Sequence, residues 1–207
     1  MRSLKKTVVL NIDPEDPDKG LIGAAAKILR SGGLVAFPTE TVYGLGADLL
    51  NKKAIARLRK VKDRPEGKPF TVHIASASYI KRLGCRITRP GKILIAKYWP
   101  GPLTLILSGP DGLKTGFRMP DNKTALSLIK KAGVPVVAPS ANISGKIPPT
   151  TGADVLRQLD GKIDLLLDAG PTDVGIESTV IDMTVTPPRI LRQGAISRQE
   201  LIKAIYG

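Results

Sequence analysis

The chain has 207 residues, 42% of them hydrophobic, with 32 lysines and arginines against 18 aspartates and glutamates, which gives a formal net charge of +14. This length can bury one sizeable core, and the apolar runs fall far short of the roughly 18 residues that a membrane span needs, so a membrane protein is excluded. The charge indicates a surface that attracts phosphates, nucleic acid or acidic metabolites, although an ordinary lysine-rich surface would give the same count.

The N-terminal segment and the single cysteine predict a cytoplasmic protein. Only a four-residue apolar stretch precedes Asn11, which is too short for the core of a signal peptide. One cysteine, Cys85, excludes an internal disulfide and a multi-cysteine zinc site, and it fits a reducing compartment. No histidine lies near Cys85 in sequence, so we interpret it as a packed thiol rather than a nucleophile.

Helices and strands alternate in the first part of the chain. Residues 20–30 are predicted to form a helix, because their apolar positions share one face and two glycines follow. Residues 34–37 then form a buried strand. Asn51 is a good N-cap for a second helix that Pro65 ends. Residues 70–75 alternate in the manner of a half-buried strand.

The remainder of the chain predicts an α/β fold with a mixed sheet flanked by helices. Capping boxes are expected at Thr151 with Asp154 and at Ser197 with Glu200. The end of the chain is rich in strands, which favours a mixed sheet over a purely parallel one. No repeat or linker interrupts the pattern, so a single domain over residues 1–207 is expected. Further helices are predicted at residues 76–83, 90–98, 121–132, 151–159 and 197–205, and further strands at 103–107, 116–119, 134–138, 164–168, 178–183 and 189–192.

The segment FPTETVYGLG, residues 37–46, places small polar residues directly after a buried strand. It lacks the third glycine of GxGxxG, and the chain contains no GxxxxGK[ST], so Rossmann and P-loop sites are excluded. Strand alternation would put Thr39, Thr41 and Tyr43 on one face, with Glu40 and Val42 opposite, so that two hydroxyls point into a cavity. An ordinary turn eased by glycine is the alternative.

The segment KDRPEGKP, residues 62–69, lies between the second helix and the strand FTVHIA. Binding residues gather in such loops, so Lys62, Arg64 and Lys68 are candidates, although charges of this kind are usually solvated. The only histidine, His73, shares a face with Thr71 that points away from the core side. A lone histidine is more often structural.

Two further segments end apolar strands with polar groups. Residues 138–145, APSANISG, can present hydroxyls and backbone N–H groups to phosphate oxygens. Arg118 of FRMP lies between apolar neighbours and needs a carboxylate partner or an anionic ligand, because burying an unpaired charge is costly. Residues 175–180 and 190–194 show the same pattern.

Seven ordered segments together resemble a known family: FPTETVYGLGAD, KDRP with KPFTVHI, KYWPGPLTLIL, FRMP, APSANISG, ESTVIDM and ILRQGAIS, spanning residues 34–194. The chain resembles the threonylcarbamoyl-AMP synthases of the YrdC-like family, which implies a twisted mixed sheet flanked by helices, with a large basic cavity. Two departures stand out. Many members continue into a second domain where this chain ends at Gly207, so the short single-domain form is expected, and Phe70 stands where leucine is commoner.

The resemblance implies a nucleotidyltransferase that joins L-threonine, bicarbonate and ATP into threonylcarbamoyl-AMP and pyrophosphate, with Mg²⁺ accompanying the nucleotide. A separate transferase complex would then modify the adenosine at position 37 of tRNAs, and a contact with tRNA or double-stranded RNA is expected. No covalent nucleophile is needed, because the carbamate oxygen itself attacks the α-phosphate. The protein therefore needs mainly to align anions and to stabilise charge.

The resemblance also assigns residues by their position in the matching segments. Arg64 and Arg118 are expected to be catalytic through charge stabilisation. Lys114 is the weakest assignment because no motif fixes it, and the metal ligands are not predicted. Threonine would be held by Thr41, His73, Arg118, Ser178 and the backbone at Ala138. ATP would be held by Lys62, Arg64, Lys68, Lys114, Ser140, Asn142, Ser144 and Arg192.

Two other functions fit parts of the pattern. A non-catalytic module that binds double-stranded or structured RNA would explain the charge, although aromatic residues make up only 4% of the chain, which argues against a base-stacking surface. A carbamoyl-transfer domain that acts on another carbamoyl adenylate is the second, and a free-standing chain of 207 residues makes it less favoured.

Overall fold

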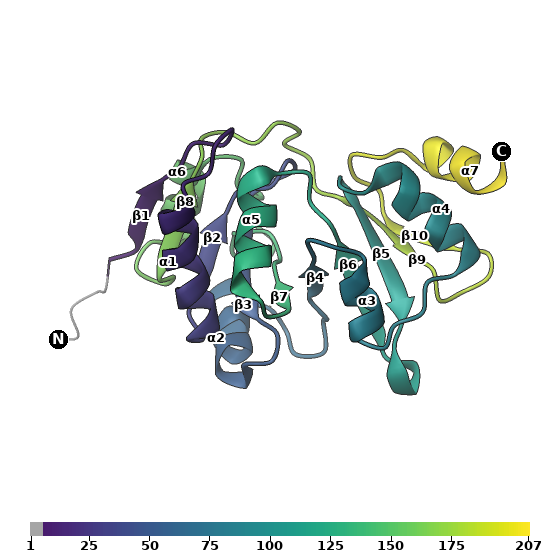
Figure 1. Cartoon of the computed structure of the whole chain (residues 1–207), viewed down its shortest axis with the longest axis horizontal. Helices are drawn as coiled ribbons and strands as arrows, with labels where there is room; N and C mark the ends of the chain where they lie inside the picture. The colour runs from purple at the N-terminus through teal and green to yellow at the C-terminus, as the bar shows by residue number, and fades with distance from the viewer. Residues whose placement is uncertain (1–5) are drawn as a thin grey trace.

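Figure 1 shows the computed structural model, which describes residues 6–207 with the side chain of Asp111 excepted. Residues 1–5, which begin the segment considered above for a targeting signal, lie outside the described residues. The helices are α1 (Lys19–Arg30), α2 (Lys52–Lys62), α3 (Ser78–Arg82), α4 (Arg89–Tyr98), α5 (Lys123–Ala132), α6 (Gly152–Leu159) and α7 (Arg198–Tyr206), with a 3₁₀ turn η1 (Pro110–Gly112). The strands are β1 (Val8–Asn11), β2 (Val35–Phe37), β3 (Gly44–Asp48), β4 (Thr71–His73), β5 (Leu103–Ser108), β6 (Lys114–Arg118), β7 (Val136–Val137), β8 (Leu165–Asp168), β9 (Thr179–Asp182) and β10 (Arg189–Arg192).

Every helix and strand predicted from the sequence is present, with shifted ends, and two strands were not predicted. Strand β1 is an exposed edge strand, and β3 has the sequence GLGAD, which has low strand propensity. Gly46 in β3 packs so closely on β2 that an added Cβ would lie 2.9 Å from the Phe37 ring and 3.2 Å from the Val35 oxygen. The glycines of this strand therefore allow a close approach of two backbones.

The helix caps agree with the sequence in part. The Asn51 side chain accepts hydrogen bonds from the first turn of α2, but that helix ends at Asp63, whose backbone is left-handed at φ 49°, before Pro65 is reached. Ser197 and Glu200 form both bonds of a capping box. At α6 the Thr151 hydroxyl accepts from the Asp154 N–H, while the Asp154 carboxylate pairs with Arg157.

Among the described residues, the strands form one ten-stranded sheet in the order β1-β8-β2-β3-β7-β4-β6-β5-β9-β10. The sheet contains parallel pairs, such as β4 with β6, and antiparallel pairs, such as β4 with β7, which confirms the mixed sheet. Helices flank this twisted sheet (Figure 1). Within residues 6–207, no helix has both the length and the apolar character needed to cross a bilayer.

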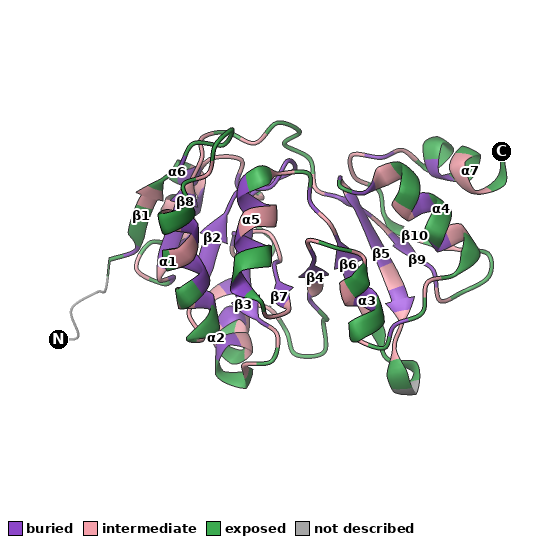
Figure 2. Ribbon diagram, in the orientation of Figure 1, coloured by how far each residue is buried: buried purple, intermediate pink, exposed green. Residues whose placement is uncertain are grey.

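The two faces of the sheet are covered differently. Side chains of Val72, Phe117 and Val137 point into a core with residues of α2, α3, α4, α6 and α7. On the opposite face, α1 and α5 pack over the strands β8, β2, β3 and β7. Figure 2 shows buried strands between helices whose outer surfaces are exposed. The rest of that second face, over β4, β6, β5, β9 and β10, carries polar side chains and forms the floor of a cavity.

Candidate functional site

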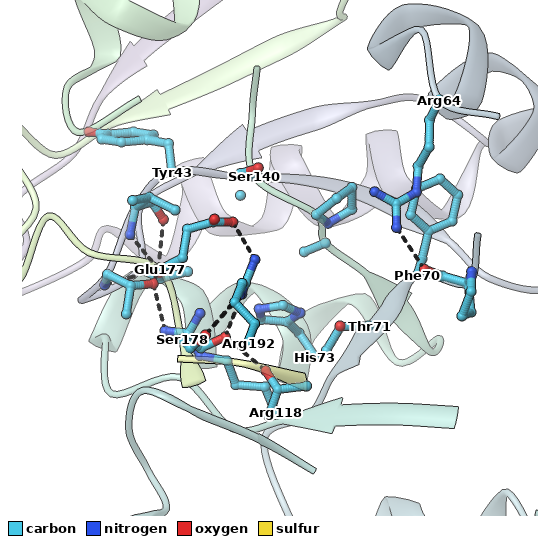
Figure 3. Close-up of a pocket in the computed structure, with 18 residues that line it drawn as sticks. Tyr43, Arg64, Phe70, Thr71, His73, Arg118, Ser140, Glu177, Ser178 and Arg192 are labelled. Carbon is cyan, nitrogen blue, oxygen red and sulfur yellow. Dashed lines mark hydrogen bonds and ion pairs between the residues drawn. The ribbon is translucent and has the colours of Figure 1, made fainter. Parts of the chain in front are cut away.

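The cavity brings together residues from eight separated parts of the chain (Figure 3). Its floor follows from the strand register, because His73 of β4 lies directly opposite Arg118 of β6 and partners across a ladder point to the same face. Thr104 and Ser178 lie on the same face, with their hydroxyl oxygens 2.9 Å apart. Eight of the residues predicted from the sequence line this inner cavity, namely Thr41, Arg64, His73, Arg118, Ala138, Ser140, Ser178 and Arg192.

The remaining predicted residues line two hollows that adjoin the inner cavity. An outer hollow is lined by Lys62, Lys68, Asn142 and Ser144, and it shares Arg64, Ser140 and Glu177 with the inner cavity. A side groove, which shares Arg64 and Arg192 with the inner cavity, contains Lys114. The Lys114 ammonium is 2.9 Å from the Asp182 carboxylate, so Lys114 already has a protein partner.

Arg118 is the most buried cation of the inner cavity, at 5% exposure. Its Nη2 lies 2.7 Å from Glu40 Oε2 and donates to Thr41 Oγ1 at 2.8 Å, while Nε donates to the Gly101 oxygen at 3.4 Å. Burial lowers the pKa of Arg118 and the Glu40 carboxylate opposes that shift. The carboxylate thus favours the charged form of the buried guanidinium, and among the described residues no hydrogen bond or ion pair occupies Nη1, which is available to a ligand.

The segment before β3 does not have the predicted strand conformation, but its threonine hydroxyls lie at the cavity as predicted. Residues 38–43 form a loop rather than an alternating strand. The Thr39 hydroxyl donates to the Val42 oxygen at 2.7 Å and lies 2.9 Å from the Thr41 hydroxyl, so both hydroxyls meet at the cavity as expected. Glu40, expected on the opposite face, instead pairs with Arg118, because a loop is not bound by strand alternation.

Tyr43 lines the cavity and anchors this loop through its hydroxyl group. Its hydroxyl donates to the Gly170 oxygen at 2.6 Å and accepts from the Ala169 N–H at 3.2 Å, and it lies 3.1 Å from Asp168 Oδ1. Burial raises the pKa of Tyr43 beyond its usual range, so the phenol stays protonated. These bonds tie residues 169–170, which follow β8 in the segment that leads to β9, to the loop of residues 38–43.

His73 is neutral in this setting. Burial lowers its pKa to about 3, and the nearby charge of Arg118 acts in the same direction. Its Nδ1 atom is buried with no hydrogen-bond partner among the described residues. His73 therefore contributes an uncharged ring with one unused polar atom at the cavity floor.

Arg192 is held at the cavity wall by the residues that precede β9. Its Nε and Nη2 donate to the Ser178 oxygen at 3.2 and 2.9 Å, and its Nη1 lies 2.7 Å from Glu177 Oε1. Glu177 is 34% exposed, so its carboxylate faces the solvent-filled space between the inner cavity and the outer hollow.

Arg64 projects from the opposite side of the cavity, beside Phe70 (Figure 3). Its guanidinium lies 5.1 Å from the centre of the Phe70 ring, and the Arg59 guanidinium lies 4.8 Å from the same ring. Burial lowers the pKa of Arg64, and the charges of Arg59 and Arg192 lower it further. This crowding of cations is unfavourable until an anion arrives.

Sequence reasoning missed two acidic residues of the site, Glu40 and Glu177. Each lies inside a segment that was singled out, TETVYG and GIESTV, but the argument there concerned hydroxyl groups. The charge of these two residues could have indicated their role. An acidic side chain that lies among small polar residues at the end of an apolar strand has few possible partners, and a buried cation is the main one. Cys85 is buried, which raises its pKa and supports its interpretation as a packed thiol.

The described residues do not form a dedicated metal site. They contain no group of three or more histidine, cysteine, aspartate or glutamate side chains placed to hold a metal ion. Both carboxylates at the cavity, Glu40 and Glu177, are paired with arginines. The donor set therefore does not fit a Mg²⁺ ion held by the protein alone.

Comparison with known proteins gives consistent matches. The Sua5/YciO/YrdC family model, described as "Telomere recombination", matches residues 27–194. Proteins named threonylcarbamoyl-AMP synthase from Pyrococcus abyssi and Bacillus subtilis are 43% and 44% identical over 96% and 90% of this chain. The crystal structure of P. abyssi Sua5 complexed with L-threonine superposes with a TM-score of 0.92 at 41% identity, over 97% of this chain and 61% of that one. The chain spans 61% and 56% of the lengths of the two named relatives.

Proposed function

This chain belongs to the Sua5/YciO/YrdC family, and from the cavity we propose that it synthesises threonylcarbamoyl-AMP and pyrophosphate from L-threonine, bicarbonate and ATP. The observation that carries the proposal is the convergence of Arg64, Arg118 and Arg192 on one cavity that also holds several hydroxyl groups. Relatives that carry this name match most of the chain.

The inner cavity suits a small hydroxy amino acid. Arg118 can pair with its carboxylate through Nη1, because hydrogen bonds between a guanidinium and a carboxylate are charge-assisted and strong. Neutral His73 and the hydroxyls of Thr41 and Ser178 surround the same space without adding charge. The structure of P. abyssi Sua5 in complex with L-threonine supports threonine as this amino acid.

The outer hollow suits the phosphates of ATP. Arg64 and Ser140 lie at the junction of the two spaces, so a nucleotide held there would place its α-phosphate beside the amino acid. Lys68 and Ser144 are exposed at the rim, where further phosphates would lie. We propose that Mg²⁺ arrives on the phosphate oxygens and keeps much of its water, since this ion dehydrates reluctantly.

In the proposed reaction the protein aligns anions rather than supplying a nucleophile. The carbamate of threonine attacks the α-phosphorus through its own oxygen, and pyrophosphate leaves. Arg64 and Arg192 would stabilise the charge that develops at phosphorus, and Arg118 would hold the amino acid in line. The buried floor keeps the reacting amine away from bulk water.

Pyrophosphate release tests the proposal. The protein is incubated with ATP, bicarbonate and each amino acid in turn, and signal with threonine that needs bicarbonate is expected. Arg64→Ala should lower the rate by about 10² to 10³, the usual effect of removing one well-placed donor. Signal with carbamoyl phosphate instead of threonine would indicate the carbamoyl-transfer alternative, and no signal at all would contradict both enzymatic functions.

A direct contact with tRNA or double-stranded RNA, delivery of the product to a separate transferase complex and a cytoplasmic location remain predictions. The exposed lysines of α2, Lys52, Lys53 and Lys60, provide part of the positive surface that an RNA contact would need. Retardation of a tRNA in a gel, weakening steeply with salt, would support the contact. Weak binding with no salt dependence would contradict it.

A further inference from the structure

Lys62 is the last residue of α2 and is only 2% exposed. Lysine is rarely buried to this degree unless its ammonium group is paired, because a charge without partners is costly to remove from water. The resemblance placed Lys62 among the residues that contact ATP. Its hydrogen bonds point to another role.

An ammonium group has three N–H donors, and one loop satisfies all three. Lys62 Nζ donates to the backbone oxygen of Ser140, to the backbone oxygen of Asn142 at 2.7 Å and to Asn142 Oδ1 at 3.3 Å. No N–H of this group is left for a phosphate oxygen. The same residue also accepts from the loop, because the Ser144 N–H donates to the Lys62 backbone oxygen at 2.7 Å.

Other bonds hold the loop from different sides: the Ala141 N–H donates to the Tyr43 oxygen at 2.7 Å, and the Ile143 N–H donates to Gln158 Oε1 of α6 at 3.2 Å. The Asn142 amide donates to the Ile143 oxygen at 3.1 Å and to the Lys146 oxygen at 2.6 Å, which closes the turn locally. Lys62 provides the contacts that join this turn to α2. Residues 140, 142 and 144–146 all line the outer hollow, so the position of the loop sets the shape of that hollow.

Lys68 offers a contrast within the same hollow. It is exposed, and its side chain forms no hydrogen bond or ion pair within residues 6–207. Its ammonium group is free to meet a phosphate. Two lysines of one hollow therefore differ in what their N–H groups can do.

The charges that face Lys62 are known. Burial and the charge of Arg64 together lower its pKa to about 8, and the Glu177 carboxylate opposes them. Three acceptor oxygens around one nitrogen favour the protonated form, because a neutral amine would turn a lone pair toward one of them. The surroundings thus match an ammonium group used as an internal cross-link.

We propose that Lys62 is a positioning residue that ties the loop of residues 140–146 to the end of α2 and does not itself contact the nucleotide. Phosphate oxygens are then met by Arg64, Lys68, the hydroxyls of Ser140 and Ser144, and the backbone of that loop. This inference rests on the proposed function for the identity of the ligand, whereas the loop contact itself does not depend on it.

The test compares Lys62→Met with Lys68→Met, which remove the same charge with the same replacement. Amide hydrogen exchange is measured in the ligand-free protein, and ATP and L-threonine affinities are measured separately by calorimetry. In Lys62→Met, the Ser144 and Lys146 amides should exchange about tenfold faster or more, and ATP should bind about tenfold more weakly, the size expected for losing one hydrogen bond to a charged group. Threonine affinity should stay within about twofold.

The control separates a cross-link from a ligand contact. Lys68→Met should weaken ATP binding and leave loop exchange unchanged. Unchanged exchange in Lys62→Met, or equal behaviour of the two variants, would overturn the proposal. If Lys62→Met does not fold, Lys62→Gln takes its place. A loss of threonine affinity in the Lys62 variant and in Lys68→Met would also overturn a role of Lys62 that is confined to this loop. Wild-type protein that binds no ATP would refute the proposed function, while the exchange comparison would still judge the loop contact.

Discussion

The buried pair of Glu40 and Arg118 gives the sharpest prediction on stability. Their side chains are 7% and 6% exposed and their charged atoms lie 2.7 Å apart. Glu40→Ala leaves the guanidinium buried without its counter-charge, and only the bonds to Thr41 and Gly101 remain. Breaking one side of such a pair typically costs about 3 to 5 kcal/mol.

An exposed pair of the same length provides the control. Glu15 and Lys123 also lie 2.7 Å apart, but their side chains are 82% and 60% exposed. Exposed pairs contribute about 0 to 1 kcal/mol, so Glu15→Ala should change little. In a chain of this size 1 kcal/mol corresponds to roughly 2 to 4 °C in Tm, so Glu40→Ala should lower Tm by roughly 6 to 20 °C.

Differential scanning calorimetry of both variants measures the effect, with urea unfolding as the second assay. Glu40→Gln, which keeps the size of the side chain, should lie between wild type and Glu40→Ala. Equal shifts in Tm for Glu40→Ala and Glu15→Ala would refute the reasoning, because they would mean that burial does not decide the strength of the pair.

Three further predictions concern charge in the cavity. Arg118→Ala should lower threonine-dependent pyrophosphate release by about 10² to 10³, and a rate within a few-fold of wild type would contradict its role. The pKa of His73 is about 3 in the folded protein and about 6.5 in the unfolded chain. Between about pH 3 and about pH 6.5 the folded protein therefore binds fewer protons, and the contribution of His73 to the free energy of unfolding falls as the pH falls. Urea unfolding should therefore show a pH dependence in wild type that exceeds that of His73→Gln by up to about 1.4 kcal/mol per pH unit, and identical slopes would contradict it. Glu177→Gln, which frees Arg192, should raise ATP affinity up to about fivefold relative to the exposed control Glu66→Gln, while equal or weaker binding would be contrary to expectation.

Most of the fold could be predicted because its elements carry local signals. Apolar periodicity marks α1 and α5, and the side chains of Asn51 and Ser197 cap their helices as their types suggest. Strand β3 carries no such signal, because Gly46 is required by the close approach of the Phe37 ring of the neighbouring strand. That contact exists only once the sheet has formed.

The candidate site divides in the same way. The hydroxyl and cationic residues stand at strand ends in recognisable segments, so their convergence on one region could be expected. Their pairings could not, because the link from Glu40 to Arg118 joins residues 78 positions apart through a loop conformation. The same applies to Lys62, whose partners, Ser140 and Asn142, lie 78 and 80 positions away. Residue type thus predicted which residues gather around the cavity. Only the tertiary structure determines which of them pair with one another and which remain free for a ligand.

The most direct test is a crystal structure of the protein with L-threonine and a non-hydrolysable ATP analogue. The account predicts the amino acid in the inner cavity, with its carboxylate on Arg118, and phosphates on Arg64 and Ser140 at the entrance to the outer hollow. Threonine bound elsewhere, or a nucleotide whose phosphates do not reach that junction, would contradict it.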